Sequence, residues 1–179
     1  MIRLNMISTF SSDRIAYTDI APDNYVSTDS LLQNCEGVVP YDGVPDVRSI
    51  VEYKKGDILL SNIRPYLQKI WLADRNGGCS SDVLVIRITD EHFSSEFVYY
   101  ALRRKPFFDY VMTNVKGMKM PRGNKNHIMR YEIPAISLDE QKAIVNEIHG
   151  YEERIAKARF IMDGCANRKY SILKEHLGM

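Results

Sequence analysis

The chain has 179 residues, of which 45% are hydrophobic and 26% are charged, and its formal net charge is +1. These values are typical of a globular protein with one sizeable core, and the sequence shows neither a signal-peptide start nor an apolar run of membrane-spanning length. Three distant cysteines, Cys35, Cys79 and Cys165, suit neither a disulfide framework nor a metal cluster. We therefore expect a cytoplasmic protein with free thiols.

Charge is distributed unevenly along the chain. Residues 1–57 carry a net charge of −4, residues 58–130 carry +6 and residues 131–179 carry −1. A single lysine or arginine is usually a solvated surface residue, but a basic middle section can form a local anion-binding face.

The first three quarters of the chain predict short strands and turns with short helices. Ile58–Leu60 is an apolar run typical of a buried strand. The Arg64-Pro65 pair is expected to end it, because the residue before a proline prefers extended geometry. Leu67–Ala73 and Val83–Ile88 are strand-like and flank Asn76-Gly77-Gly78, so we expect them to form a hairpin.

Two short helices should follow. Ser94 or Ser95 can cap the first, and Pro106 can stop it and open the second. Their aromatic residues suit core packing better than base stacking. Strands and helices do not alternate regularly, so the sequence predicts an α+β fold with an irregular mixed sheet and hairpin domain over residues 1–137.

A basic stretch, "NVKGMKMPRGNKNHIMR", runs from Asn114 to Arg130 and contains no acidic residue. Gly117, Pro121 and Gly123 interrupt it, so we expect a loop without regular secondary structure. This loop is the strongest candidate for contact with an anionic ligand.

The segment "ISLDEQKAIVNEI", from Ile136 to Ile148, opens a long helix. Ser137 and Glu140 form the S-x-x-E pattern, in which each side chain bonds the backbone amide of the other residue. A helix that is continuous from Leu138 to Leu177 would be about 60 Å long, against about 30 Å for the width of the preceding domain. We therefore expect much of the helix to extend beyond the domain.

Apolar positions on this helix recur at alternating spacings of four and three. This pattern favours a coiled coil, which needs a second copy or another protein as partner, over a helix that folds back on its own domain. The predicted seam consists of Ile144, Ile148, Tyr151, Ile155, Ala158, Met162, Cys165 and Ile172, with Lys169 and His176 at two polar positions.

No catalytic constellation is evident in the sequence. It lacks phosphate-binding glycine loops, H-E-x-x-H and C-x-x-C, and its four histidines lack metal-ligand spacing. Asp57, Asp74 and Asp82 suggest the carboxylate cluster of a nuclease, but aspartate is common at turns. Ser80-Ser81-Asp82 suggests a nucleophile, but no histidine is near it in the sequence. A binding module without metal or cofactor is favoured over an enzyme.

The order of several segments resembles one half of the DNA-specificity subunit of type I restriction–modification systems. The resemblance is carried by "GDILLS" (Gly56–Ser61), "SSDVLVI" (Ser80–Ile86) and "IPAISLDEQKAIV" (Ile133–Val145), in this order and spacing. In that family a target recognition domain precedes a long conserved helix, and both then occur a second time. Here one copy of each is expected, over residues 1–137 and 138–179.

The resemblance implies a non-catalytic half-subunit. Two copies would pair through antiparallel helices and read double-stranded DNA at two inverted half-sites. The implied partners are a DNA adenine methyltransferase subunit, which binds S-adenosylmethionine, and a restriction and translocation subunit, for which ATP and magnesium are expected. This chain would supply specificity and scaffold.

Contacts with DNA are expected mainly from the basic stretch. Its cations can neutralise phosphates, Arg122 can pair with a guanine, and Asn124 or Asn126 can pair with an adenine. The predicted DNA-binding residues are Lys116, Gly117, Lys119, Arg122, Asn124, Lys125 and Asn126, with Arg64 and Lys69 as further candidates. The rival hypotheses are a nuclease with a dimerisation helix and a coiled-coil protein that never binds DNA.

Overall fold

The computed structural model describes residues 1–43 and 47–178. The chain divides into two compact units, Met1–Gln141 and Lys142–Met179. This division falls four residues after the domain boundary predicted at residue 137, inside the terminal helix. Met179, the last residue of the predicted second domain, lies outside the described residues.

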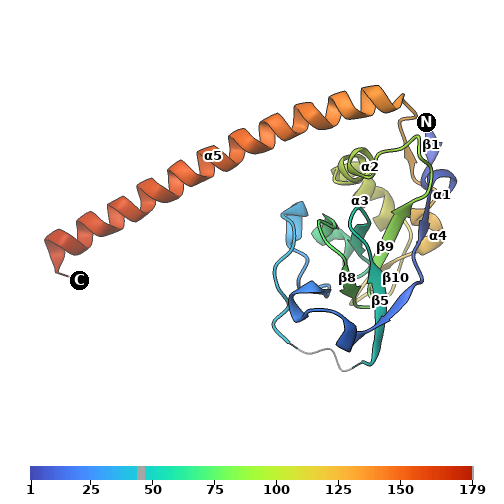
Figure 1. Cartoon of the computed structure of the whole chain (residues 1–179), viewed down its shortest axis with the longest axis horizontal. Coiled ribbons are helices and arrows are strands. Elements are labelled where there is room, and N and C mark those ends of the chain that lie inside the picture. The colour runs from blue at the N-terminus through green and yellow to red at the C-terminus, as the bar shows by residue number, and fades with distance from the viewer. Residues whose placement is uncertain (44–46, 179) are drawn as a thin grey trace. The chain divides into compact units, whose positions relative to one another are not determined.

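Two four-stranded sheets form the body of the first unit (Figure 1). One has the order β2-β9-β6-β7 and is antiparallel throughout. The other has the order β3-β5-β8-β4, in which β4 pairs with β8 in parallel. The strands of the first sheet are β2 (Ser8–Phe10), β6 (Ile58–Ser61), β7 (Ile70–Leu72) and β9 (Val83–Ile88). Those of the second are β3 (Arg14–Ala16), β4 (Tyr25–Val26), β5 (Ser49–Tyr53) and β8 (Gly77–Cys79).

Shorter elements complete the first unit. Two-stranded ribbons pair β1 (Ile2–Arg3) with β12 (Glu132–Ile133), and β10 (Val115–Lys116) with β11 (Arg122–Gly123). The α-helices are α1 (Leu4–Ile7), α2 (Ser95–Leu102), α3 (Lys105–Met112) and α4 (Lys125–Ile128). Single 3-10 turns are η1 (Tyr17–Asp19), η2 (Pro22–Asn24), η3 (Gln33–Cys35) and η4 (Pro65–Leu67). The predicted mixture of strands and short helices is confirmed.

One apolar core joins the two sheets. Leu59 of β6 and Tyr53 of β5 are fully buried in it, and the Tyr53 ring lies edge-on to Trp71 of β7, with centroids 5.8 Å apart. The Tyr53 hydroxyl donates to the Asn24 carbonyl at 2.9 Å, which satisfies its only donor inside the core. Burial raises the pKa of Tyr53 to about 12.

The predicted hairpin of Leu67–Ala73 with Val83–Ile88 is wrong. Its two strands, β7 and β9, both pair with β6 instead of with each other. Gly77 and Gly78 do not form the tight turn but belong to β8 of the other sheet. They lie so close to Tyr53 and Ile50 that an added Cβ would come within 2.5 Å of the tyrosine hydroxyl and 2.2 Å of the isoleucine. The glycines are therefore needed for packing between neighbouring segments.

The reason predicted for the end of the β6 strand is also wrong. β6 ends at Ser61, but Arg64 adopts left-handed geometry, with φ 51° and ψ 62°, where an extended pre-proline residue was expected. Its amide donates to the Pro121 carbonyl at 2.8 Å, and its carbonyl accepts from the Leu67 amide at 2.9 Å. These two bonds hold a conformation that is uncommon for a residue other than glycine.

An arginine on β9 joins two of the places where the chain crosses between the sheets, the connections from β2 to β3 and from β5 to β6. Arg87 donates to Asp57 through two nitrogens, at 2.9 and 2.7 Å, and to Asp13 at 2.7 Å. Asp57 precedes β6 and also accepts from the Lys54 amide at 2.8 Å, which closes the turn after β5. Asp13 lies between β2 and β3. The hydrogen bond from Arg87 lowers the pKa of Asp13, and the hydrogen bond to Asp57 raises the pKa of Arg87.

The terminal helix α5 runs without interruption over Leu138–Leu177, as the fold class predicted. Its capping box is confirmed: the Ser137 amide donates to the Glu140 carboxylate at 2.9 Å, and the Glu140 amide donates to the Ser137 hydroxyl at 3.3 Å. The Ser137 hydroxyl also donates to this carboxylate at 2.7 Å, and this bond together with the one from the Ser137 amide lowers the pKa of Glu140. Within residues 1–43 and 47–178, no helix combines the length and apolar character needed to cross a membrane.

Gln141 anchors the start of α5, a role that sequence reasoning missed. Its side chain is fully buried. The amide oxygen accepts from the Ser94 amide at 2.9 Å, and the amide nitrogen donates to the carbonyls of His92 and Ile136 at 2.9 and 3.0 Å. The first turn of the helix is thus bound to the loop that precedes α2.

We predict that Asp57→Asn destabilises the fold by about 2–3 kcal/mol, which is less than the roughly 3–5 kcal/mol of a fully buried pair because Arg87 stays partly solvated. Asp13→Asn is the matched control, since it removes an exposed partner of the same arginine, and its effect should be much smaller. Urea denaturation measures both. Equal losses in the two variants would contradict the central role of Asp57.

Candidate nucleic-acid interface

The basic stretch folds into the β10–β11 ribbon followed by one turn of helix, α4. The expectation of a loop without regular structure is therefore wrong. Gly117 takes a φ of +86°, which lets the chain turn immediately after β10. Gly123 lies so close to Asn62 and Ile128 that a side chain would crowd them. The glycines that were taken as interruptions shape the two ends of the ribbon.

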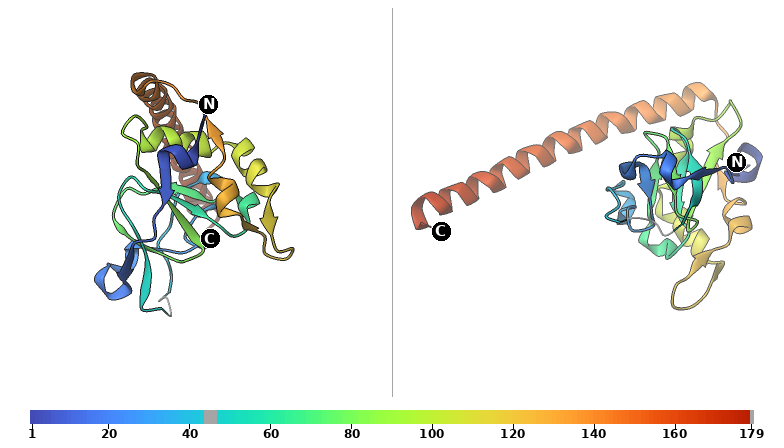
Figure 2. Two further views of the ribbon diagram at one scale, coloured as in Figure 1. Left: turned by 90° about the vertical axis from the view of Figure 1, so that its right-hand side faces the viewer. Right: turned by 60° about the horizontal axis from the view of Figure 1, so that its bottom comes forward.

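Three predicted cations lie on this ribbon, which projects from the body of the first unit (Figure 2). The side chains of Lys116, Lys119 and Arg122 are exposed, as is Gly117. Arg122 also donates to both carboxylate oxygens of Asp82, at 3.1 and 3.3 Å, and 55% of its side chain remains accessible. An exposed ion pair of this kind contributes about 0–1 kcal/mol, so the arginine can exchange the carboxylate for a phosphate at little cost.

Asn124 has a structural role that sequence reasoning did not assign. Its side-chain oxygen caps α4, accepting from the amides of Asn126 and His127 at 3.0 and 3.3 Å. Its side-chain nitrogen donates to Asn114 at 3.2 Å. Reading an adenine edge with Asn124 would require breaking these bonds. Asn126 contributes its backbone amide to the cap while the residue is exposed, so it is the better placed of the two asparagines to meet a base.

A groove that the sequence did not indicate lies beside α4. It has a volume of about 350 Å³, and its polar lining consists of Ser11, Ser12, Arg14, Ser81 and Lys125. Arg14 and Ser81 also line a neighbouring hollow of about 250 Å³. Two cations and three hydroxyls at one concave surface are a suitable lining for an anionic backbone.

Lys125 and Arg14 are oriented in this groove by neighbouring groups. The Lys125 ammonium lies 5.9 Å from the centre of the Phe10 ring, and the Arg14 guanidinium donates to the Ser49 hydroxyl at 2.8 Å. The serine–aspartate turn that suggested a nucleophile has another use, because Ser81 lines the groove and Asp82 binds Arg122.

The two second-tier candidates differ in their surroundings. Arg64 is exposed, and its backbone bond to Pro121 joins it to the end of the ribbon. The Lys69 ammonium donates to the Thr28 carbonyl at 2.7 Å and is partly buried. Arg64 is therefore brought to the ribbon, whereas Lys69 is engaged in holding a loop of the fold.

The three aspartates considered for a nuclease site belong to separate ion pairs. Asp57 binds Arg87, Asp74 binds Arg75 and Asp82 binds Arg122. In the part of the chain that the structure describes, no three His, Cys, Asp or Glu side chains gather as a metal site would require. The arrangement does not support the carboxylate-cluster hypothesis.

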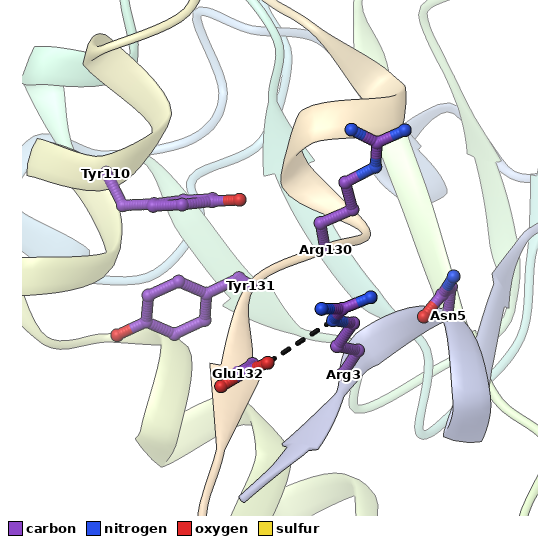
Figure 3. A pocket seen from close by; sticks show the side chains of 6 residues that line it. All are labelled: Arg3, Asn5, Tyr110, Arg130, Tyr131 and Glu132. Atoms are coloured by element: carbon purple, nitrogen blue, oxygen red, sulfur yellow. Dashed lines mark hydrogen bonds and ion pairs between the residues drawn. The ribbon is translucent and has the colours of Figure 1, made fainter.

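A wider hollow of about 750 Å³ lies between α3 and the β1–β12 ribbon. Figure 3 shows Arg3 paired with Glu132 at 3.2 Å, while Arg130 extends away from that pair. The residues lining the hollow are Arg3, Asn5, Tyr110, Arg130, Tyr131 and Glu132. Arg130, the last cation of the basic stretch, thus lies at this second surface.

The predicted seam residues lie along α5. Tyr151, Ile155 and Met162 are 56%, 52% and 69% exposed, and Ile144 and Ile172 are each 41% exposed. Ala158 and Cys165 are exposed, and Ile148 is half-buried. Large apolar side chains on an exposed helix indicate a surface that binds a partner.

The chain is similar to type I restriction specificity subunits. It is 28% identical over 119 residues to the type I restriction enzyme EcoDI specificity subunit of Escherichia coli, a match that covers 65% of this chain and 26% of that protein. No protein-family model matches the chain. The resemblance stated from the sequence is confirmed by this match.

Solved structures have the same fold. The HsdS subunit from Thermoanaerobacter tengcongensis matches with a TM-score of 0.69 and 22% identity, over 97% of this chain and 47% of that one. A structure that describes complex assembly and conformational transition of the type I R-M system matches with a TM-score of 0.70 and 22% identity, over 98% of this chain and 47% of that one. The type I restriction–modification S subunit from M. genitalium matches with a TM-score of 0.61 and 20% identity, over 94% of this chain and 42% of that one. The chain spans about half the length of these structures and about a quarter of the E. coli protein.

We predict that Asn124→Ala destabilises the fold by about 1 kcal/mol, because the cap of α4 is lost. Asn126→Ala should leave stability unchanged, since only its backbone takes part in the cap. Urea denaturation of the two variants checks this difference. Unchanged stability of Asn124→Ala, together with weakened DNA binding, would contradict the structural role and favour base reading.

Proposed function

We propose that this chain is a DNA-reading unit of a type I restriction–modification specificity subunit. The first unit binds double-stranded DNA through the β10–β11 ribbon, α4 and the adjoining groove, and α5 serves as spacer and dimerisation helix. The observation that carries the proposal is a projecting ribbon with exposed Lys116, Lys119 and Arg122, in a stretch without an acidic residue. The similarity to specificity subunits supports the same function.

In this proposal the chain performs no catalysis. Two copies pair through antiparallel α5 helices and read two inverted half-sites in the cytoplasm. A DNA adenine methyltransferase subunit that binds S-adenosylmethionine, and a restriction and translocation subunit that uses ATP and magnesium, supply the chemistry. The ribbon neutralises phosphates, and the bases are read by the side chains nearest to it, among which Arg122 and Asn126 have the required donors.

We predict that Lys119→Glu weakens binding to duplex DNA of any sequence and reduces the salt dependence of binding. Loss of one phosphate contact lowers the slope of log K against log salt by about 0.9. Lys55→Glu is the matched control, because Lys55 is also exposed but lies on the turn before β6. Fluorescence anisotropy with a random duplex at several salt concentrations measures both. Equal effects of the two variants would reject the ribbon as the binding surface.

Arg122 is tested separately because it also binds Asp82. We expect Arg122→Ala to weaken DNA binding, whereas Asp82→Asn, which removes the same ion pair but keeps the arginine, should not weaken it. Sequencing of methylated genomic DNA from cells that express each variant with its methyltransferase then distinguishes two contacts. A base contact relaxes one position of the target, and a phosphate contact lowers methylation evenly at all sites. If Arg122→Ala and Asp82→Asn both bind DNA with the same affinity as the unchanged chain, Arg122 does not belong to the interface.

A further inference from the structure

The tip loop, residues 117–121, closes the β10–β11 ribbon and carries two exposed methionines. Met118 is 102% exposed, the highest value among the large hydrophobic residues that the structure describes, and Met120 is 46% exposed. Single exposed apolar residues are common on protein surfaces. These two stand out because they lie on either side of Lys119 and shortly after Lys116, on an element that projects from the body of the first unit (Figure 2).

The ribbon is held at its base by the segment that follows β6. The Gly123 amide donates to the Asn62 carbonyl at 3.0 Å, and the Arg64 amide donates to the Pro121 carbonyl at 2.8 Å. Pro121, the last residue of the tip loop, is buried. The fold therefore fixes the backbone that carries Met118, while the methionine side chain extends into solvent. A side chain on a fixed backbone can be pressed into a partner without the cost of first ordering a loop.

The chemistry of the tip loop matches the two kinds of surface that DNA offers. Lysine neutralises phosphates on the outside of the duplex. Methionine gains from contact with the bases, because their faces are apolar and its unbranched, polarisable side chain packs well against aromatic rings. Proteins that bind the minor groove insert methionine and other apolar side chains between neighbouring base pairs, which partly unstacks the bases and kinks the duplex. A methionine between two lysines is suited to such insertion.

We propose that Met118 is a wedge that enters the minor groove and partly unstacks one base step of the DNA target. The proposal rests on the proposed function and specifies how the ribbon contributes to recognition. Lys116 and Lys119 bind the phosphates that border the step. Unstacking costs least at the flexible pyrimidine–purine steps TA, CA and TG. The wedge thus selects such a step without a hydrogen bond to any base edge.

Contact of Met118 with a thymine methyl group in the major groove is the competing arrangement, because that groove also admits a two-stranded ribbon. Such a contact selects thymine at one position and leaves the bases stacked. A wedge selects a step of two base pairs and unstacks it. The complete exposure of Met118 at the tip favours the wedge, since a contact along the groove would use side chains on the strands of the ribbon.

Selection of duplexes from a random library by the full chain tests the sequence preference. We expect the unchanged chain to enrich a pyrimidine–purine step at one position, and Met118→Leu, which keeps an apolar side chain of similar volume, to enrich the same step. Met118→Ala should lose this preference and keep the others. Met6→Ala is the matched control, since Met6 is 69% exposed but lies on α1. Loss of a preference for thymine at a single position would overturn the wedge.

Fluorescence of 2-aminopurine placed at the enriched step tests unstacking directly, because stacking quenches this base. The unchanged chain and Met118→Leu should raise the fluorescence several-fold when the duplex is saturated, whereas Met118→Ala should not raise it. Saturation separates this result from a loss of affinity. Fluorescence that stays quenched with the unchanged chain would overturn the proposal.

Salt dependence distinguishes the wedge from the cations beside it. We expect Met118→Ala to raise the dissociation constant for the selected duplex roughly tenfold without changing the slope of log K against log salt, because no phosphate contact is lost. Lys119→Glu should lower the slope by about 0.9. An equal loss of slope in both variants would show that Met118 only supports the phosphate contacts, and the proposal would be wrong.

Failure of the wedge is distinguishable from failure of the proposed function. A chain whose DNA binding depends on Lys119, but whose affinity, step preference and 2-aminopurine signal are the same after Met118→Ala, overturns the wedge and leaves the DNA-reading unit in place. If Met118→Ala abolishes binding to the methyltransferase subunit and leaves DNA binding unchanged, the tip loop binds protein and the proposal is wrong. A chain that binds no duplex rejects the proposed function, and the wedge with it.

Discussion

The clamp formed by Arg87 is the interaction on which the rest of the first unit depends. One guanidinium binds Asp57 and Asp13, which lie in two of the connections between the sheets. Asp57 is almost fully buried, so its charge is stable there only because two arginine nitrogens and the Lys54 amide surround it. Without this clamp the sheets would share a core, but the β2–β3 and β5–β6 connections would have no common attachment.

The candidate interface is built outward from that clamp. Ser11, Ser12 and Arg14, which line the groove, flank Asp13 in the sequence, so the clamp also positions the groove. The strand that carries Arg87 begins immediately after Asp82, and Asp82 binds Arg122 at the base of the ribbon. Aspartates thus hold Arg87 in the body of the unit and Arg122 at the base of the ribbon. Lys116 and Lys119, further out on the ribbon, remain exposed and can meet a phosphate backbone.

Local signals were reliable where one segment determines its own structure. The capping residues Ser137 and Glu140, the strand at Ile58–Leu60 and the start of α3 around Pro106 are set by neighbouring residues. Ser94 occupies the N-cap position of α2 as predicted, but its side chain makes no capping hydrogen bond. Roles that depend on distant groups could not be predicted. Asn124 has the side chain of a base reader, but its geometry makes it a helix cap, and Gly77-Gly78 has the composition of a turn, but close packing places it in a strand.

The sequence by itself determined that a mixed domain precedes one long helix, where that helix begins, and where the cations lie along the chain, because periodicity, capping and charge are local properties. Only the tertiary structure decided that β7 and β9 flank β6, that Arg64 takes left-handed geometry beside Pro121, and that Lys69 is engaged while Arg64 is exposed. Strand order and side-chain partners depend on which distant segments share a core, and a local pattern is compatible with several such pairings.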